Sequence, residues 1–354
     1  MFAERPGRGM FTDVFAYRAG EEPPSLHLLP RPYPVGIHSD YVGVLSRGGR
    51  HHLVVVPEPR FEACGRMVYD LRVFSSETMS WSTTVAPVAA GTDCDLLARH
   101  APTKVVSVGG VGLGWVDLRR GVLLCNVADE RPEMRLVELP SLLGTNRADF
   151  GEGFDGATPP LRHIRDVTCS SDGGSLRFIE IEYPDLDESN LTAFRWTATM
   201  FTRGICADNW DKCCTVDSAE LSPAADACLP GLVPEIWEGK KLALDKVIST
   251  APARDLYDED VVYMIAKLNV DDPNRFAVLA VDTRNKTLVG VAPFAAESFF
   301  YFQPTYQQCS FTKYLGKDQC NFTDMWPNEK NAKQNFWHPD PTEWWTNIWE
   351  LSVQ

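Results

Sequence analysis

The sequence has no hydrophobic run long enough to cross a membrane and no excess of basic side chains. Its longest apolar stretches, such as Leu53–Val56, have the length of a β-strand, whereas a membrane-spanning helix needs about 18 apolar residues. Of the 354 residues, 48 are acidic and 34 are basic, so the net charge is −14, which argues against binding to the phosphate backbone of nucleic acid. The N-terminus is rich in Gly and Pro and has no apolar core, so no secretory signal is predicted.

Cysteine is too sparse for a disulfide scaffold, with ten cysteines at irregular spacings. We therefore expect free thiols and a reducing compartment, the cytoplasm or the nucleus. Four cysteines form the densest group: Cys206, Cys213, Cys214 and Cys228. Their spacing does not fit the short C-x₂₋₄-C pairs of zinc sites, so no metal is predicted. Cys309 and Cys320 are expected to form a disulfide only in an oxidising setting.

Motifs for nucleotide binding and for catalysis are scarce. Gly151–Gly156 fits G-x-G-x-x-G, but it lacks the preceding strand and the following helix that a dinucleotide site needs. Gly109–Gly114 lies between two predicted strands, and we expect its glycines to let two backbones approach closely. The sequence contains no nucleophile elbow, P-loop or H-E-x-x-H motif. His51 and His52 point to opposite faces if they lie on a strand, so they cannot hold one metal ion.

Acidic residues supply the candidates for acid–base chemistry. Glu180 and Glu182 share one strand face about 7 Å apart, and a solvated face is the preferred interpretation. Asp117 and Asp166 precede apolar positions, and we expect each to bond a local backbone N–H group. Asp166, Glu180 and His163 are the residues to examine for an enzyme. No catalytic, cofactor-binding or metal-binding residue is assigned.

Short apolar runs separated by Gly, Pro, Asn and Asp are abundant, which predicts an all-β protein with few short helices. Helical periodicity is found in Asp258–Lys267 and Glu235–Val247. Two polar linkers are predicted, Gly144–Pro160 and Pro184–Asn190. The predicted strands are Val42–Leu45, Leu53–Val56, Met67–Phe74, Lys104–Val108, Leu113–Leu118, Val122–Val127, Leu176–Ile181, Thr192–Phe201, Val261–Leu268, Phe276–Val281 and Thr287–Val291.

Three windows of the sequence look alike, each with a strand, a polar turn, a second strand and a closing proline. They are Val73–Pro87, Asn126–Pro140 and Leu279–Pro293, at offsets of 53 and 153 residues. These offsets predict a period near 51 residues, with two weaker copies near residues 177 and 228. A period of about 50 residues is typical of kelch-type propeller blades, each of which ends in an outer hairpin.

The clearest local unit is a hairpin over Leu113–Val127. With Arg119–Gly121 as a three-residue turn, Leu118 pairs with Val122 and Val116 with Leu124. One face of the hairpin then carries Val116, Leu118, Val122 and Leu124, and the other carries Trp115, Asp117, Leu123 and Cys125. Because both faces are largely apolar, we expect this strand pair to lie between neighbouring sheets.

Several stretches of the chain share a pattern with one family. They are Val108–Gly110, Gly114–Leu118, Gly121–Cys125, Arg165–Val167, Leu176–Glu180, Phe74–Thr78 with Trp81, Leu26–Pro30 and Tyr301–Leu315. Residues 11–315 thereby resemble a plant family, mainly of grasses, known as domain of unknown function 1618. Asn126 departs from the Asp that members often carry, the start is shorter than theirs, and the Trp-rich end does not match. The resemblance implies a β-propeller-like fold akin to F-box-associated domains, with no established activity, cofactor or catalytic residue.

We therefore divide the chain into an N-terminal segment (1–24, expected to be truncated), a propeller-like domain (25–315), complete or not, and a Trp-rich tail (316–354). The preferred function is a non-enzymatic protein–protein interaction module that binds no nucleic acid, membrane or cofactor. Its acidic field favours a basic patch on the protein partner. Two alternatives stay open: a hydrolase with its site in the propeller channel, and a truncated family member without function.

Overall fold

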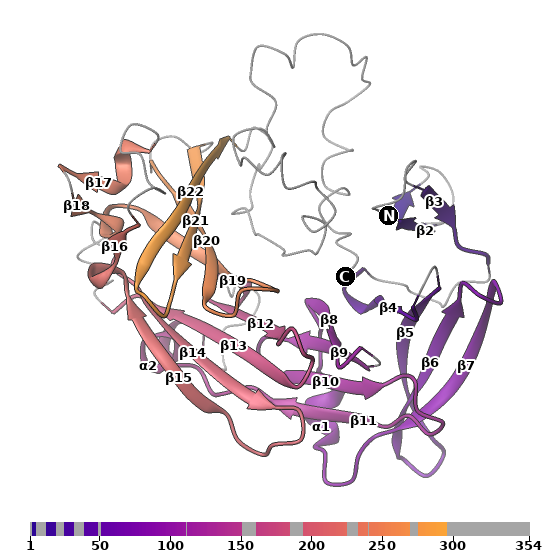
Figure 1. Cartoon of the computed structure of the whole chain (residues 1–354). Coiled ribbons are helices and arrows are strands. Elements are labelled where there is room, and N and C mark those ends of the chain that lie inside the picture. Colours follow the sequence, from indigo (N-terminus) through magenta and orange to yellow (C-terminus); the bar gives the residue numbers. More distant parts are fainter. Residues whose placement is uncertain are drawn as a thin grey trace.

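The computed structural model shows a molecule built mainly of antiparallel β-sheets with few short helices, as the short apolar runs predict. It describes the residues 2–4, 12–18, 25–31, 39–48, 51–110, 112–150, 161–184, 194–224, 233–239, 241–269 and 275–295. Most strands belong to four sheets that follow one another in chain order along an arc (Figure 1). Among the described residues, no helix is long and apolar enough to cross a membrane.

Each of the four sheets contains four consecutive strands that pair antiparallel in chain order. Sheet 1 consists of β4 (Gly43–Ser46), β5 (His52–Phe61), β6 (Met67–Ser75) and β7 (Ser80–Pro87). Sheet 2 consists of β8 (Lys104–Val108), β9 (Gly112–Asp117), β10 (Gly121–Asn126) and β11 (Met134–Glu138). Sheet 3 consists of β12 (Arg165–Cys169), β13 (Ser175–Glu182), β14 (Thr197–Gly204) and β15 (Asp211–Asp217). Sheet 4 consists of β19 (Ile248–Arg254), β20 (Val261–Lys267), β21 (Arg275–Asp282) and β22 (Thr287–Ala295), with β16 (Ser222–Pro223) parallel to β22.

The remaining elements are short. A small sheet near the N-terminus contains β1 (Phe2–Glu4), β2 (Thr12–Arg18) and β3 (Ser25–Leu28), and β17 (Trp237–Glu238) pairs with β18 (Lys241–Leu242). The described residues contain two α-helices, α1 (Cys94–Ala98) and α2 (Gly144–Phe150). Single 3₁₀ turns lie at Ser39–Tyr41, Leu161–His163, Ser218–Glu220, Pro234–Ile236 and Leu244–Lys246.

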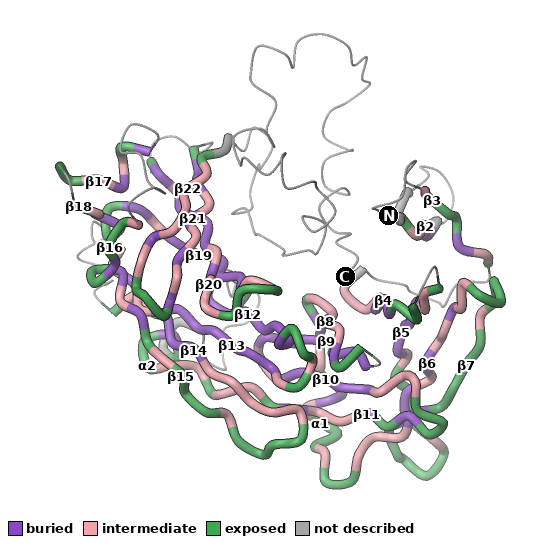
Figure 2. Tube along the Cα trace, viewed as in Figure 1, coloured by how far each residue is buried: buried purple, intermediate pink, exposed green. Residues whose placement is uncertain are grey.

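The first strands of the four sheets lie next to one another along the arc. β4 contacts β8, β8 contacts β12, and β12 contacts β19. The last strands of sheets 1 and 3, β7 and β15, are exposed along most of their length. Figure 2 shows the same gradient, with buried residues along the inner strands and exposed residues along the outer strands and turns.

Alternate residues of the middle sheets pack into different cores. Trp115 packs with sheet 1, whereas the next residue, Val116, packs with sheet 3. In sheet 3, Phe178 packs with sheet 2 and Ile179 packs with sheet 4. Strand geometry explains this, because successive side chains point to opposite faces. Each large apolar side chain that is fully buried in this way contributes about 1.5–3 kcal/mol to the free energy of folding.

The hairpin of β9 and β10 confirms the predicted faces but not the predicted register. Asp117 pairs with Gly121 and Val116 with Val122, so the three-residue turn is Leu118–Arg120 instead of Arg119–Gly121. Val116 thus pairs with a residue two positions earlier than predicted. Because side chains alternate between faces with a period of two, a shift of two residues leaves every side chain on its predicted face. Both faces are buried between sheets, as expected for this strand pair.

The three similar windows are the outer hairpins of three sheets: β6–β7, β10–β11 and β21–β22. One further hairpin, β14–β15, lies between the second and the third, so the prediction of two copies near residues 177 and 228 is wrong. The first strands of sheets 1, 2 and 3 begin 61 residues apart, at Gly43, Lys104 and Arg165, and sheet 4 begins 83 residues later. The offset of 153 residues was divided into three periods of 51, but it covers only the two steps from sheet 2 to sheet 3 and from sheet 3 to sheet 4. Longer connections within sheet 3 and before sheet 4 account for the extra length.

The two predicted helices are wrong. Asp258–Lys267 contains β20, because the run of β-branched and aromatic residues from Val261 to Ile265 favours a strand between β19 and β21. Glu235–Val247 contains 3₁₀ turns and the short pair β17–β18. The predicted strand Thr192–Phe201 begins later, as β14 at Thr197.

The predicted linkers are only partly covered by the described residues. Gly144–Pro160 begins with the helix α2, which corrects the expectation of a linker there, and 151–160 lie outside the described residues. Of Pro184–Asn190, the structure describes only the first residue. The tail 316–354, with Cys320, and residue Cys309 also lie outside the described residues.

Candidate functional site

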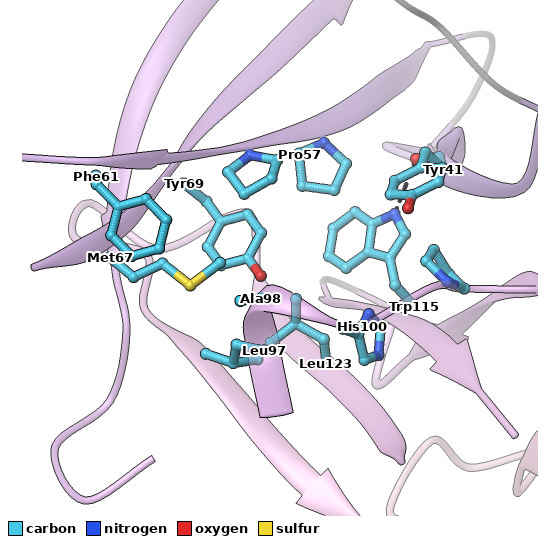
Figure 3. A pocket seen from close by; sticks show the side chains of 12 residues that line it. Tyr41, Pro57, Phe61, Met67, Tyr69, Leu97, Ala98, His100, Trp115 and Leu123 are labelled. Atoms are coloured by element: carbon cyan, nitrogen blue, oxygen red, sulfur yellow. Dashed lines mark hydrogen bonds between the residues drawn. The ribbon is translucent and has the colours of Figure 1, made fainter. Parts of the chain in front are cut away.

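A pocket of about 230 Å³ lies between sheets 1 and 2. One wall comes from β5 and β6, another from β9 and β10, and α1 with the loop that follows it completes the enclosure (Figure 3). Twelve side chains line it: Tyr41, Pro57, Pro59, Phe61, Met67, Tyr69, Leu97, Ala98, His100, Pro102, Trp115 and Leu123.

Strand alternation directs β5 and β6 into the pocket. Pro57, Pro59 and Phe61 are two residues apart on β5 and therefore share a face. Their cross-strand neighbours on β6 include Tyr69, opposite Pro59, and Met67, opposite Phe61. β4 pairs with residues 52–55 of β5 and ends before the prolines. Pro57 and Pro59 therefore lie where no neighbouring strand on the β4 side requires a backbone N–H donor from β5. Figure 3 shows Phe61 and Met67 at one end of the pocket, with Tyr69 beside them.

The opposite end of the pocket is held by two hydrogen bonds to backbone carbonyls. Trp115 Nε1 donates to the carbonyl oxygen of Tyr41 at 2.9 Å, which joins β9 to the turn before β4. His100 Nε2 lies 3.2 Å from the carbonyl oxygen of Gly121, as donor. Figure 3 shows Tyr41, Trp115 and His100 together at this end. The indole and imidazole are therefore fixed in place before any ligand arrives.

The pocket carries no formal charge at neutral pH. None of the twelve lining residues is Asp, Glu, Lys or Arg. Burial raises the pKa of Tyr69, and burial together with the charges of Asp40 and Asp117 raises the pKa of Tyr41. Burial lowers the pKa of His100, and the carboxylate of Asp117 opposes that shift without reversing it. All three groups are thus driven toward their neutral forms, which suits an apolar ligand.

Glu180 does not lie on a solvated face, which overturns that interpretation. It is fully buried and forms an ion pair with Arg165, whose Nη2 lies 2.6 Å from Glu180 Oε2. Its other oxygen accepts from Leu143 N at 2.9 Å and from Asn146 Nδ2 at 2.7 Å. Glu182 accepts from the backbone N and the hydroxyl of Thr145. Both carboxylates anchor the segment around α2.

Asp117 binds backbone N–H groups, as predicted. Its Oδ1 accepts from Arg119 N at 2.8 Å and from Arg120 N at 3.1 Å, which closes the β9–β10 turn. Its Oδ2 accepts from Ala101 N at 2.9 Å and from the guanidinium of Arg120. This carboxylate is fully occupied in holding local structure.

Asp166 joins three sheets. Its Oδ1 lies 2.5 Å from Lys104 Nζ on β8, and its Oδ2 accepts from Arg254 N on β19 at 3.3 Å. The predicted backbone bond is therefore present, but its donor is 88 residues away in sequence and not local. We name this three-residue contact the inter-sheet bridge.

The three residues selected for an enzyme do not converge. Glu180 is the cross-strand partner of Arg165 and Asp166 that of Ile179, so these two carboxylates point to opposite faces of sheet 3. His163 lies in the turn before β12, and its carbonyl oxygen accepts from the hydroxyl of Thr250 at 2.8 Å. Burial lowers the pKa of its imidazole.

The structure tests the predictions for the glycine and cysteine clusters only in part, because some of these residues lie outside the described ones. Gly109 lies against Gly173 of the β12–β13 turn, which confirms the expected close approach of backbones. Gly151–Gly156 lie outside the described residues. In the described part of the chain, no group of three His, Cys, Asp or Glu residues could hold a metal ion. Cys206, Cys213 and Cys214 have free thiols, and Cys228 lies outside the described residues.

Sequence reasoning missed most of the pocket. The sequence predicts Trp115 on one face of a hairpin and a strand that ends at Val56, whereas β5 continues to Phe61. The available signal was the alternation of Pro57, Pro59 and Phe61, which places three rings on one face of an extended segment. Tyr69 carried no signal, because its role depends on pairing with Pro59.

Comparison with known proteins supports the family resemblance over part of the chain. Residues 115–263 match the family model described as "Protein of unknown function (DUF1618)", a stretch that begins within β9 and ends within β20. No match was found among curated proteins.

Solved structures give weak fold similarities only. Hydrazine synthase of Kuenenia stuttgartiensis aligns at 12% identity over 67% of this chain and 51% of its own, with a TM-score of 0.28. Dipeptidyl peptidase 4 of Porphyromonas gingivalis aligns at 11% identity over 72% and 33%, with a TM-score of 0.28. Acylaminoacyl peptidase of Pyrococcus horikoshii aligns at 10% identity over 68% and 38%, with a TM-score of 0.29. The chain thus spans about a third to a half of each of these longer chains.

Proposed function

We propose that this protein is a non-enzymatic protein–protein interaction module that holds an apolar side chain of its partner in the pocket between sheets 1 and 2. The observation that carries the proposal is the uncharged lining of that pocket, whose titratable groups are all shifted toward neutrality. Pockets that accept apolar groups combine aromatic walls with a few fixed polar atoms, as the Tyr69 hydroxyl and the His100 imidazole supply here.

The mouth of the pocket presents apolar surface to solvent. Phe61 lines the pocket and is nevertheless 61% exposed. A large aromatic side chain at the rim of an apolar cavity is typical of the anchor positions in protein interfaces. The net charge of −14 favours a partner segment with basic residues flanking the apolar one, because opposite charges speed association.

The architecture fits the same role. As part of this proposal, the four sheets are blades of a β-propeller-like array of the F-box-associated kind, in a plant protein of the cytoplasm or nucleus. Four sheets, each with four consecutive antiparallel strands and with adjacent first strands, support this. Rigid sheets of this kind present fixed surfaces and turns, which suits recognition of another protein.

Affinity purification of the intact chain from its own tissue tests the proposal. We compare the wild type with Phe61→Asp, which places a charge at the pocket mouth, and with Tyr257→Asp. Tyr257 is a matched control, because it is 53% exposed and lies in the turn after β19, away from the pocket. Trp115→Ala, which removes a buried side chain that lines the pocket, is a second pocket variant, and circular dichroism of every variant checks its folding. We expect a protein partner that the wild type and Tyr257→Asp recover and Phe61→Asp loses. Equal recovery by all the folded variants, or turnover of a small molecule without a partner, contradicts the proposal.

A further inference from the structure

Two arginines are buried between sheets 3 and 4, far from the pocket. Arg177 on β13 is 3% exposed, and Arg254 at the end of β19 is 6% exposed. Sheets 3 and 4 meet here, since β12 and β13 both contact β19 (Figure 1). Burying a guanidinium is unfavourable unless its N–H groups and its charge are matched.

Both guanidinium groups lie against the turn that joins β19 to β20. Arg177 Nη2 donates to the carbonyl oxygen of Asp255 at 3.0 Å, and Arg254 Nη2 donates to that of Glu259 at 2.7 Å. The positive charge of Arg177 contributes, after burial, to a lowered pKa of Arg254. The two cations are therefore close enough to repel each other.

Several donors of this cluster lack a partner. Arg177 Nε and Nη1 and Arg254 Nε are buried and form no hydrogen bond with any described residue. The same holds for the hydroxyl of Thr168, which is the cross-strand neighbour of Arg177 and shares its face. Each buried donor left unpaired costs about 1–3 kcal/mol, and more when it is charged.

The charges around the two arginines are unbalanced. Asp166 is engaged by Lys104 in the inter-sheet bridge. Within the described part of the chain, the one ion pair that either guanidinium forms is between Arg177 Nη1 and Glu259 Oε1, at 3.8 Å. The Glu259 side chain is 54% exposed, so it is held loosely. In the described part of the chain, Glu259 is thus the one carboxylate in an ion pair with either guanidinium, whereas Asp166 acts on Arg254 through its charge without an ion pair.

We propose that Arg177 and Arg254 form a binding site for a phosphate group, free or carried on a monoester, that takes the place of the Glu259 carboxylate. Guanidinium groups match oxyanions in charge and in donor geometry, and the Thr168 hydroxyl adds a neutral donor. Glu259 swings into solvent when the phosphate binds, because most of its side chain already lies there. The site is independent of the pocket between sheets 1 and 2.

Titration of the intact chain with inorganic phosphate, at ionic strength held constant with chloride, tests this site. We expect the Tm to rise with phosphate and calorimetry to give a saturable isotherm, because a ligand that binds only the folded state stabilises it. Arg177→Met and Arg254→Met weaken the apparent affinity at least about tenfold, whereas Glu259→Gln strengthens it by removing the competing carboxylate. A parallel titration with methyl phosphate distinguishes the sources: binding of both indicates a site for phosphorylated molecules, and binding of inorganic phosphate alone indicates a site for the free ion.

The matched control is Arg60→Met, since Arg60 is paired with Asp70 on the exposed face of sheet 1. Its phosphate response equals that of the wild type if the proposal holds. If the Met variants do not fold, Arg177→Lys and Arg254→Lys keep the charge but lose the planar donors, and we expect weaker phosphate binding from both. No saturable phosphate response in the wild type overturns the proposal. So does a response that survives in the arginine variants or does not increase in Glu259→Gln.

Discussion

At the scale of single residues, the buried charge of Arg165 is matched by partners on other elements. Arg165 is matched by Glu180 through two guanidinium–carboxylate hydrogen bonds, and it also donates to the carbonyl oxygens of Leu118 and Pro140. The Arg165 guanidinium also lies 5.1 Å from the centroid of the Phe178 ring. These contacts hold the segment after β11 onto sheet 3, so the pair fixes the position of a connection as well as a strand register.

We predict that Glu180→Gln destabilises the fold by about 3–5 kcal/mol, because it leaves the buried Arg165 guanidinium without a counter-charge. Chemical denaturation of the purified chain measures the change. Glu182→Gln is the matched control, on the same strand face but partly exposed, and it costs about 1 kcal/mol or less. Equal losses in the two variants contradict this account of the pair.

Acid should weaken the fold in part through His100. Burial lowers the pKa of this imidazole below its usual value of 6.5, so the unfolded chain binds a proton more readily than the folded chain. The contribution to stability is present above pH 6.5 and declines as the pH falls from there toward the folded-state pKa. We expect His100→Gln to lose less stability than the wild type between about pH 7 and about pH 5.

Urea denaturation at the two pH values measures this difference. His51→Gln, which alters an exposed histidine, is the control and keeps the wild-type dependence. If His100→Gln loses as much stability between the two pH values as the wild type does, other groups cause the pH dependence.

The sequence could not predict the buried ion pair between Arg165 and Glu180, because the pair depends on how two strands are aligned. Glu180 follows Leu176 and Phe178 on one strand face, and both are buried apolar residues. That alternation places a carboxylate in a core, but only the pairing of β12 with β13 brings Arg165 opposite it. Asp117 was predictable, because its partners at Arg119 and Arg120 lie within three residues in sequence.

At the scale of elements, the turns of neighbouring sheets meet at glycines. A Cβ on Gly173, which has a positive φ of 72°, lies 2.3 Å from the backbone N of Gly109. The β8–β9 turn of sheet 2 and the β12–β13 turn of sheet 3 can approach so closely only because Gly173 lacks a side chain, whereas a Cβ on Gly109 would lie at an ordinary 3.8 Å from the carbonyl oxygen of Gly173. The glycine cluster at 109–114 therefore serves the packing of sheets.

We predict that Gly173→Ala destabilises the fold by about 1–3 kcal/mol more than Gly65→Ala does. Gly65 is a matched control, with a φ of 83° and no atom within 4 Å of an added Cβ, so it reports backbone strain alone. Thermal and urea denaturation measure both variants. Similar losses in the two variants mean that the turns do not touch as described.

The local alternation of apolar residues predicted the hairpins, whereas the unequal lengths of the loops between them led to a wrong number of hairpins. The alternation in Leu113–Val127 was enough to assign both faces of the hairpin, because a register shift of two residues keeps each side chain on the same face. The count of sheets failed because β12 to β15 and the connection before β19 contain longer loops, which stretch the interval between outer hairpins. Strands β12, β15 and β19 were missed because each carries polar or charged residues among its apolar ones.

At the scale of the whole molecule, the inter-sheet bridge joins sheets 2, 3 and 4 through one carboxylate. We predict that Asp166→Asn destabilises the fold by about 1.5–3 kcal/mol, because Lys104 loses its counter-charge at a site only partly open to water. We also expect faster amide hydrogen exchange in both β8 and β19. Asp70→Asn, in an exposed pair, is the control and leaves both strands unchanged. Faster exchange in one strand only argues against a bridge across three sheets.

The most direct measurement of the interaction role is site-specific photo-crosslinking in the protein's own tissue. A benzophenone amino acid replaces Phe61 at the pocket mouth in one version of the intact chain and Tyr257 in another. We predict a discrete crosslinked adduct with one protein from position 61, none of it from position 257, and loss of the adduct when Trp115→Ala is added. The same adduct from both positions, or no protein adduct from position 61, contradicts the assignment of this pocket as the partner site.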